Sequence, residues 1–363
     1  MNAMSPRPAL DSSLTQQLLA MTLGVAQTHA LSVAAQLKLA DLMKDGPQSA
    51  TALATATRTH LPTLTRLMTM LCHMGVFAQT APGQFSCTPL GALLQIDSPN
   101  SVRHYALLMS GDWFSQAWPH LIQSFYTGRS AFEPILGTNI YQYFQQHRAA
   151  EAVLQQAMSE LSIQEGLAIR ETYDFLPYPT IVDVGCGHGS LMATLLQALP
   201  AGRGVLFDLP SVVDSAQTMS TLEPFQERCE LVGGDFLEAV PAGGDIYALK
   251  RILIDRTDAD ARTLLTNIRT AMDRRGRLLV ADPESHSQYG MSLDMFKLVM
   301  FGSRLRSNAE IQELLAQSGF RLLRTMETSS NIRASLSTAS SDSGRTPSWR
   351  ICASSGMLNW FVL

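Results

Sequence analysis

From Pro177 onward the sequence alternates between short apolar segments and longer segments with helical periodicity. The apolar segments have the length of buried strands, and those between them, such as Leu191–Leu199 and Ala259–Met272, have the spacing of amphipathic helices. This alternation predicts right-handed β-α-β units in a mostly parallel, doubly wound sheet, which binds ligands at the carboxyl ends of its strands. The predicted strands are Thr180–Val184, Gly204–Phe207, Glu230–Val232, Ile246–Leu249 and Arg277–Ala281.

A glycine-rich loop follows the first predicted strand and leads into a helix, with Gly185, Gly187 and Gly189 at every second position. Glycines let the backbone turn tightly and approach a ligand, and a helix N-terminus offers free N–H groups. The third glycine comes one residue too early for a dinucleotide fingerprint. Asp183 puts a carboxylate at the mouth of the loop, where it repels a pyrophosphate and attracts a cationic amine. S-adenosyl-L-methionine has such an amine.

Two further acidic residues follow the next two predicted strands. Asp208 ends the second strand, where a carboxylate can accept hydrogen bonds from ribose hydroxyls. Asp235 and Phe236 follow the third strand and suit the amine and the ring face of an adenine. The loop is a weak signal alone, but acidic residues at three successive strand ends form a specific pattern.

The region before the sheet predicts two helical parts. In residues 14–100, two helices and a short hairpin around Pro82-Gly83 form a winged-helix pattern. Its second helix carries few cations for phosphates, which favours an apolar dimerisation module over a DNA reader. Residues 101–175 are helical and rich in aromatic side chains, among them Trp113 and Phe114, which form a core or line a pocket for a flat apolar ligand.

Composition excludes several classes of protein. Hydrophobic residues make up 46% of the 363 positions and charged residues 16%, which is typical of a globular chain. A net charge of -4 without a basic face argues against nucleic-acid binding. The five cysteines lack a C-x-x-C pair and the histidines lack metal-ligand spacing, so we predict no disulfide framework and no metal. Without a secretion signal or an apolar span, we expect a cytoplasmic protein that binds no membrane.

The segments VDVGCGHG, FDLPSVV, LVGGDFLEAVP and DIYALKRIL, together with the winged helix, resemble the S-adenosylmethionine-dependent O-methyltransferases of the plant caffeic-acid type and their bacterial secondary-metabolite relatives. The resemblance implies a homodimer with interlocking winged-helix domains and a small aromatic substrate. It assigns Asp183 and Gly185 to the methionine part of the cofactor, Asp208 to the ribose, Asp235 and Phe236 to the adenine, and Lys250 to the cofactor's edge. The predicted cofactor-binding set is Asp183, Gly185, Gly187, Gly189, Asp208, Leu209, Asp235, Phe236 and Lys250.

The sequence departs from this family where proton transfer is expected. The resemblance implies a histidine base at position 254 and an orienting acid at position 305, but the residues are Ile254 and Leu305. An aliphatic side chain cannot accept a proton. Asp255 and Asp282, the latter matching the family's other orienting acid, are the candidate catalytic residues, and His286 is a weaker candidate. We expect methyl transfer by proximity without this base, because a sulfonium is already an activated leaving group.

A cationic residue stands where the family usually places a methionine against the substrate ring. Lys297 can pair there with a substrate carboxylate or phenolate, or lie at the rim with its ammonium in water. The predicted substrate-pocket residues are Trp113, Phe114, Met158, Ile254, Asp294 and Lys297.

The sequence as a whole predicts a doubly wound Rossmann-like methyltransferase domain preceded by an all-helical and winged-helix dimerisation domain. We expect O- or N-methylation of an aromatic metabolite. The alternatives are a family member that keeps the cofactor without transferring its methyl, or a non-catalytic cofactor-binding dimer. The expected divisions are a disordered start (1–13), the dimerisation domain (14–100), the helical pocket region (101–175), the cofactor-binding domain (176–328) and a loosely ordered Ser- and Ala-rich tail (329–363).

Overall fold

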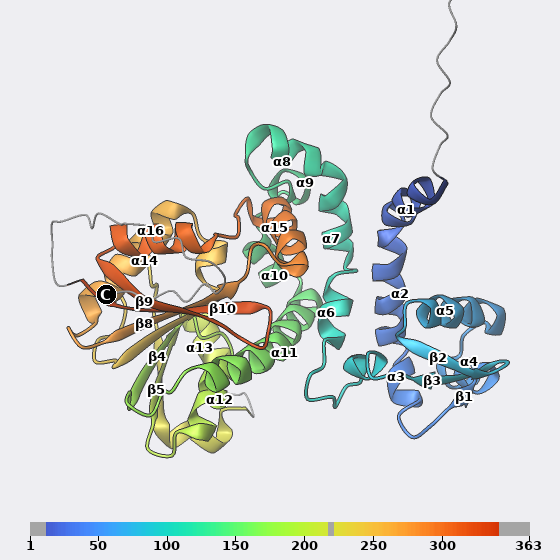
Figure 1. The fold of residues 1–363 in the computed structure, drawn as a ribbon, viewed down its shortest axis with the longest axis horizontal. Coiled ribbons are helices and arrows are strands. Elements are labelled where there is room, and N and C mark those ends of the chain that lie inside the picture. Colours follow the sequence, from blue (N-terminus) through green and yellow to red (C-terminus); the bar gives the residue numbers. More distant parts are fainter. Residues whose placement is uncertain (1–11, 217–220, 341–363) are drawn as a thin grey trace, which may run out of the picture. The chain divides into compact units, whose positions relative to one another are not determined.

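The structure is a computed structural model that describes residues 12–216 and 221–340 (Figure 1). The described chain forms two compact units. The first contains residues 12–114 and 152–160, and the second contains residues 115–151 and 161–340. The long helix α11 (Arg148–Thr172) contributes to both. The predicted region 101–175 is therefore divided between the units, and the predicted start at 1–13 lies outside the described residues except where α1 begins at Ser12.

The first unit contains the predicted winged helix. Ser49 caps the first of its two helices by accepting a hydrogen bond from the Ala52 N–H, and the β2–β3 hairpin turns at Gly83, which has a φ of +71°. Its three-stranded sheet has the order β1-β3-β2. The elements of the unit are α1 (Ser12–Thr22), α2 (Gly24–Gln36), α3 (Leu39–Leu42), β1 (Gln48–Ser49), α4 (Ala50–Thr57), α5 (Leu61–His73), β2 (Phe77–Ala81), β3 (Gln84–Cys87), η1 (Gly91–Leu94) and α6 (Arg103–Leu108), with α7 (Asp112–Ala117) at its boundary.

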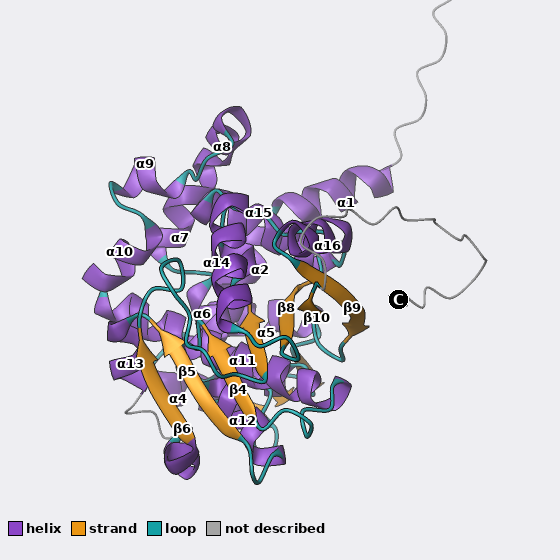
Figure 2. Ribbon diagram, turned by 90° about the vertical axis from the view of Figure 1, so that its left-hand side faces the viewer, coloured by secondary structure: helices purple, strands orange, loops and turns teal. Residues whose placement is uncertain are grey.

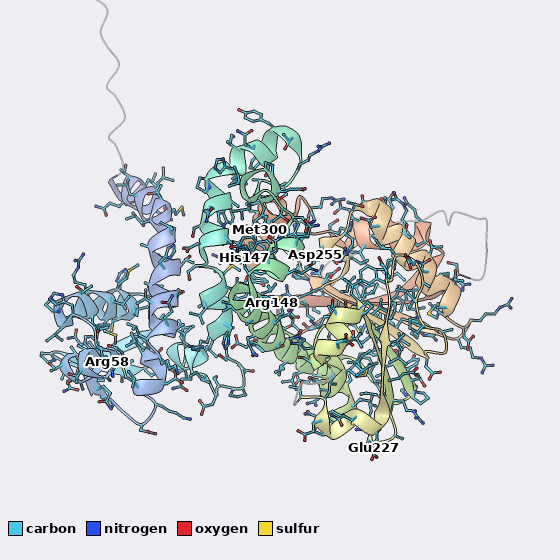
Figure 3. The ribbon with its side chains drawn as sticks, turned by 180° about the vertical axis from the view of Figure 1, so that it is seen from behind. Arg58, His147, Arg148, Glu227, Asp255 and Met300 are labelled. Atoms are coloured by element: carbon cyan, nitrogen blue, oxygen red, sulfur yellow. The ribbon has the colours of Figure 1, made fainter. Side chains whose placement is uncertain are left out.

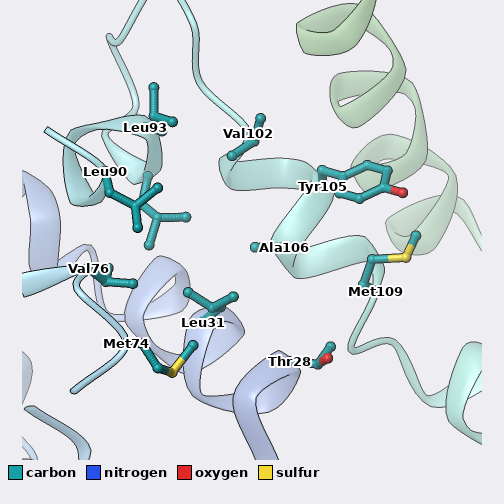
Figure 4. A pocket seen from close by; sticks show the side chains of 11 residues that line it. Thr28, Leu31, Met74, Val76, Leu90, Leu93, Val102, Tyr105, Ala106 and Met109 are labelled. Carbon is teal, nitrogen blue, oxygen red and sulfur yellow. The ribbon is translucent and has the colours of Figure 1, made fainter. Parts of the chain in front are cut away.

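Apolar surface is exposed on the first two helices of this unit. Six apolar side chains between Leu14 and Val25 are each more than half exposed. A separate hollow of about 350 Å³ in the same unit is lined by apolar side chains, among them Leu31, Met74 and Leu90 (Figure 4). Among the described residues no single helix has the length and apolarity of a membrane span. The helical segments Ser13–Thr22 and Gly24–Gln36 have that length and apolarity only when taken as a pair, and the pair is bent by 49°.

The second unit is built on a seven-stranded sheet with the order β6-β5-β4-β7-β8-β10-β9 (Figure 2). The first five strands in sequence are parallel, and the chain reverses its direction of winding between β4 and β7. This confirms the predicted doubly wound sheet and puts its ligand-binding edge beside the carboxyl end of β4. The strands are β4 (Thr180–Val184), β5 (Arg203–Asp208), β6 (Cys229–Gly233), β7 (Ile246–Lys250), β8 (Arg277–Pro283), β9 (Phe320–Glu327) and β10 (Ile332–Ala339).

Helices cover both faces of this sheet. Side chains alternate along β4, so that Ile181 packs against one core and Val182 against the other. One core includes α11, α12 and α13, and the other includes α14 and α16 (Figure 1). The helices are α8 (Leu121–Thr127), α9 (Phe132–Leu136), α10 (Ile140–Gln146), α12 (Ser190–Ala198), α13 (Pro210–Ala216), α14 (Asp258–Ala271), α15 (Gln288–Phe301) and α16 (Asn308–Gln317), with short turns η2 (Trp118–His120), η3 (Glu223–Arg228) and η4 (Leu253–Asp255).

The prediction of a loosely ordered tail from residue 329 is wrong up to Ala339. The Ser- and Ala-rich segment forms β10, which lies between β8 and β9 and pairs antiparallel with both. Ala334, Ser335 and Ser337 are buried there, because a strand covered on both faces accepts small side chains where larger ones would crowd the core. Composition suggested low complexity, whereas the strand was required to complete the sheet. The rest of the predicted tail, residues 341–363, lies outside the described residues.

Candidate functional site

The glycine loop joins β4 to α12, and all three glycines have a positive φ. A Cβ at Gly185 would lie 2.3 Å from Ile252 Cδ1, and one at Gly189 would lie 2.5 Å from Leu206 Cδ2, so a larger residue at either position would displace a side chain and strain the left-handed backbone. A Cβ at Gly187, which has a φ of +53°, would meet no protein atom within 4 Å. The loop is therefore packed against the protein at its two ends and open at its middle glycine.

Asp208 fixes the open part of the loop. Its Oδ2 accepts a hydrogen bond of 2.9 Å from the Gly187 N–H, and its Oδ1 accepts one of 2.8 Å from the Leu209 N–H. Burial raises the pKa of this carboxyl, while the two backbone hydrogen bonds act in the opposite direction. Each oxygen of a carboxylate has a further lone pair, so Asp208 can hold the loop and still accept a bond from a ligand hydroxyl.

Asp183 is a buried carboxylate at the end of β4. It is 2% exposed, and its Oδ2 accepts no hydrogen bond in the described structure. Burial raises its pKa to about 7, while the Lys250 charge lowers it and the Asp208 charge raises it further. A buried acceptor without a donor is costly, and a cationic donor at this position would satisfy it.

Lys250 ends β7 and Arg251 follows it, and both residues contact α11. Lys250 Nζ donates to Ser162 Oγ at 2.7 Å and to Glu165 Oε2 at 3.4 Å. Arg251 Nε donates to Glu165 Oε1 at 2.7 Å. Sequence analysis missed Glu165. The feature of the sequence that could have identified Glu165 is its position four residues before Ile169, which places an acidic side chain on the apolar face of the helix.

The adenine position predicted at the end of β6 is partly enclosed. Asp235 is exposed and accepts a hydrogen bond of 2.8 Å from the Leu237 N–H. Phe236 is buried, with the Arg256 guanidinium 5.0 Å from its ring centre. Its Cε1 lies 3.9 Å from the Cβ position of Gly185. The structure therefore brings Phe236 to the glycine loop and places the Arg256 guanidinium over its ring.

The segment after β7 carries no histidine base. Ile254, in η4, is 2% exposed, and Leu305 is 5% exposed. The backbone N–H of Leu305 donates to Asp294 Oδ1 at 2.6 Å. Asp294, a predicted pocket residue, therefore orders the loop before α16. The two positions to which the family resemblance assigns proton transfer are therefore buried and apolar in this chain.

Lys297 forms an ion pair with Asp255, which excludes the predicted arrangement at the rim with its ammonium in water. The ammonium is bonded to Asp255 Oδ1 and lies 4.4 Å from the Phe301 ring centre, and the residue is 7% exposed. The elements that carry the pair, η4 and α15, lie side by side, as the positions of Asp255 and Met300 in Figure 3 show. One candidate catalytic carboxylate is thus already paired with a cation of the protein.

Asp282 is the second candidate and differs from the first. It is 9% exposed, and neither of its oxygens accepts a hydrogen bond in the described structure. Burial raises its pKa to about 7, and the nearby Asp255 charge raises it further. It lines a cavity of about 20 Å³ with Arg306, whose guanidinium is bonded to Asp258. Asp282 therefore has no partner, whereas Asp255 has one.

The remaining predicted pocket residues belong to the first unit. Trp113 is buried and makes an edge contact with Phe114 at 5.8 Å between ring centres. Met158 is half-buried on α11. His286 is exposed in the loop between β8 and α15. Ile254, Asp294 and Lys297 lie in the second unit, so the six predicted pocket residues are divided between the two units. No group of three or more His, Cys, Asp or Glu side chains suited to a metal occurs within residues 12–216 and 221–340.

Two protein-family models match this chain. Residues 19–97 match the O-methyltransferase dimerisation domain, and residues 118–321 match the O-methyltransferase domain. The chain is 38% identical over 323 residues to the phenazine O-methyltransferase PhzM of Lysobacter antibioticus, covering 88% of this chain and 94% of the relative. It is 31% identical to the phenazine-1-carboxylate N-methyltransferase of Pseudomonas aeruginosa, covering 86% and 93%. The solved structure of the mitomycin 7-O-methyltransferase MmcR, at 33% identity, superposes with a TM-score of 0.82 over 92% of this chain and all of that one.

The chain therefore belongs to the O-methyltransferase family and is an S-adenosylmethionine-dependent methyltransferase. The match over residues 19–97 agrees with the dimerisation module that the winged-helix pattern predicted.

The orphaned carboxyl of Asp282 should make stability depend on pH. Its folded-state pKa, about 7, lies above the ordinary value, so the folded protein loses stability as pH rises from about 4 to about 7. Asp282→Asn removes this titration. Its free energy of unfolding relative to wild type should therefore increase by about 2–3 kcal/mol between pH 5 and pH 8, as urea denaturation can measure. Asp282→Ala should give the same pH dependence, and a difference independent of pH in both variants would contradict the assignment.

Proposed function

We propose that this enzyme transfers the methyl group of S-adenosylmethionine to an oxygen or nitrogen of a small aromatic metabolite. The observation that carries the proposal is the buried carboxylate of Asp183, whose Oδ2 has no hydrogen-bond partner, beside the open glycine loop at the point where the parallel sheet reverses its winding. A cationic amine suits that carboxylate better than a phosphate does. The names of the relatives support the substrate class, because they describe enzymes that methylate phenazine and mitomycin compounds.

The residues present fit the cofactor. Asp183 would accept from its ammonium group, Asp208 from its ribose hydroxyls, and Asp235 from its adenine amine, with Phe236 against the ring. Gly187 leaves room for close approach of the ligand to the backbone. When bound, the cofactor supplies an activated methyl group on a sulfonium.

The protein's own contribution to the reaction is positioning rather than proton removal. Ile254 and Leu305 are buried hydrocarbon at the two positions to which the family resemblance assigns a base and its orienting acid. Asp255 Oδ1 already accepts a hydrogen bond from the Lys297 ammonium, so this carboxylate is engaged within the protein. We therefore infer that the substrate nucleophile is a ring nitrogen, an amine or an acidified phenol, which needs only to be held in line with the methyl group.

The test is incubation with labelled S-adenosylmethionine and a panel of phenazines, hydroxyquinones and anthranilate-like acids. A product heavier by one methyl, formed together with S-adenosylhomocysteine, supports the proposal. A product without the added methyl would indicate a family member that uses the sulfonium only as a fixed charge. Cofactor binding without any product from the panel would favour the non-catalytic alternative.

Two substitutions test the cofactor site directly. Asp208→Ala removes the acceptor that fixes the Gly187 N–H, and Gly187→Val adds a side chain in the open part of the loop at a positive φ. Each should weaken binding of S-adenosylmethionine by more than about tenfold, measured by titration calorimetry. Unchanged affinity in both variants would remove the assignment of this loop to the cofactor.

Restoring the family's base should not help this enzyme. Ile254→His introduces a polar group into a buried apolar wall, at a cost of roughly 1–3 kcal/mol without a partner. Activity on the substrate found in the panel should rise less than about tenfold or should fall, as kcat/KM measures. Ile254→His with Leu305→Glu should gain activity on a simple phenol, because the acid can orient the histidine. A larger gain on the native substrate from the single change would show that proton removal limits the wild-type reaction.

We propose further that the enzyme is a homodimer held by its first two helices. Six apolar side chains between Leu14 and Val25 are more than half exposed, and the two helices overlap the part that matches the dimerisation domain. Leu18→Asp should weaken self-association by about tenfold or more in sedimentation velocity. Leu176→Asp changes an equally exposed leucine of the second unit and is the matched control. Equal effects, or none from Leu18→Asp, would contradict this interface.

A further inference from the structure

Glu165 is the most completely buried acidic side chain outside the strand ends of the described structure. It lies on α11 and is 3% exposed. Burial alone would raise its pKa, but the charges of Arg251 and Lys250 outweigh burial and lower it. Two cations at the carboxyl end of β7 therefore keep the Glu165 carboxylate ionised. Stability does not explain these three charges, since apolar residues would pack there at lower cost.

The two oxygens of Glu165 have separate partners. Arg251 contacts Oε1 through both Nε and Nη2, and Nη2 also donates to the Tyr289 hydroxyl at 3.4 Å. Arg251 itself has a φ of +58°, and its N–H donates to the Ala281 carbonyl at 2.9 Å, so its backbone is fixed in a left-handed conformation. The Glu165 carboxylate is thus held in place by Arg251, and its Oε2 faces Lys250.

Lys250 lies within the electrostatic influence of two buried carboxylates. It contacts Glu165 and Ser162, both on α11, and its charge also acts on Asp183. Asp183 nevertheless accepts nothing at Oδ2. Asp183 lies opposite Ala248 in the parallel pair of β4 and β7, so Lys250 follows two residues further along the partner strand on the same face. Its flexible side chain bonds to the two α11 residues instead of to Asp183.

We propose that Glu165 is a positioning residue that holds Lys250 against α11 and so keeps Asp183 available for the ammonium group of the cofactor. Without Glu165, Lys250 pairs with Asp183 and occupies the position that a cationic ligand needs. The inference rests on the proposed function, since it assigns the Asp183 carboxylate to the methionine end of S-adenosylmethionine.

The experiment compares two ligands in Glu165→Gln by titration calorimetry. S-adenosylmethionine has the ammonium group, whereas 5′-methylthioadenosine has the same nucleoside without the amino acid part. Affinity for S-adenosylmethionine should fall by about tenfold or more, and affinity for methylthioadenosine should stay within about twofold. In turnover, KM for the cofactor should rise while kcat at saturation changes little, because the interaction is lost in the ground state and the transition state alike.

Three further variants make the result specific. Glu171→Gln changes an exposed glutamate on the same helix and should alter neither affinity. Ser162→Ala removes the other helix contact of Lys250 and should shift affinity in the same direction by a smaller factor, which keeps the inference testable if Glu165→Gln folds poorly. In a Lys250→Met background, Glu165→Gln should cost less than about twofold, because no ammonium remains to capture Asp183.

The possible failures are distinguishable. Wild-type protein that binds neither ligand overturns the proposed function and this inference together. Normal binding by wild type with unchanged affinity in Glu165→Gln overturns this inference alone. An equal loss for both ligands also overturns it, because a general distortion of the site does not depend on the ammonium group.

Discussion

The carboxylate of Asp208 ties the glycine loop to the neighbouring strand, and the geometry of the site depends on that tie. The loop also bonds to this strand through the Phe207 carbonyl, which accepts from the N–H groups of Gly185 and Cys186. With three left-handed glycines in five residues, the loop has little conformational preference of its own. A side chain from the next strand therefore determines where the Gly187 backbone lies. In the proposed cofactor site, the same carboxylate would also accept hydrogen bonds from the ligand.

The buried charged side chains of the second unit, which contains the seven-stranded sheet, fall into two groups. Glu165 with Arg251, and Asp255 with Lys297, are ion pairs within the protein. Asp183 is not paired in this way, and the unpaired groups mark where a protein keeps binding capacity. Asp282 is also unpaired, but the base that its family counterpart orients is absent here. We interpret Asp183 as a carboxylate that is available to bind a ligand. We interpret Asp282 as a carboxylate without a partner because position 254 is isoleucine rather than histidine.

The fold was predictable where a single local signal was sufficient. Strand ends, the glycine loop and Asp208 follow from alternation and from the residues that interrupt it, and the predicted helices after the loop agree with α12 and α14 to within one residue. The strand β10 was missed because its small residues are selected by burial between two other strands, which composition does not reveal. The pair of Asp255 and Lys297 was missed for a related reason, since the two residues are 42 positions apart and meet only through the packing of α15.

The loss of the histidine and the pairing of Lys297 are physically connected. A lysine against a protonatable imidazole would disfavour its charged form, so a general base and a buried cation at this wall oppose each other. With Ile254 in place that conflict disappears, and Asp255 balances the cation without leaving a free base. The wall is then electrically neutral and partly hydrocarbon, which suits a flat substrate whose nucleophile is already electron-rich. The same arrangement would serve poorly for an ordinary phenol, because neither Ile254 nor the lysine-paired Asp255 is free to take its proton as the methyl group arrives.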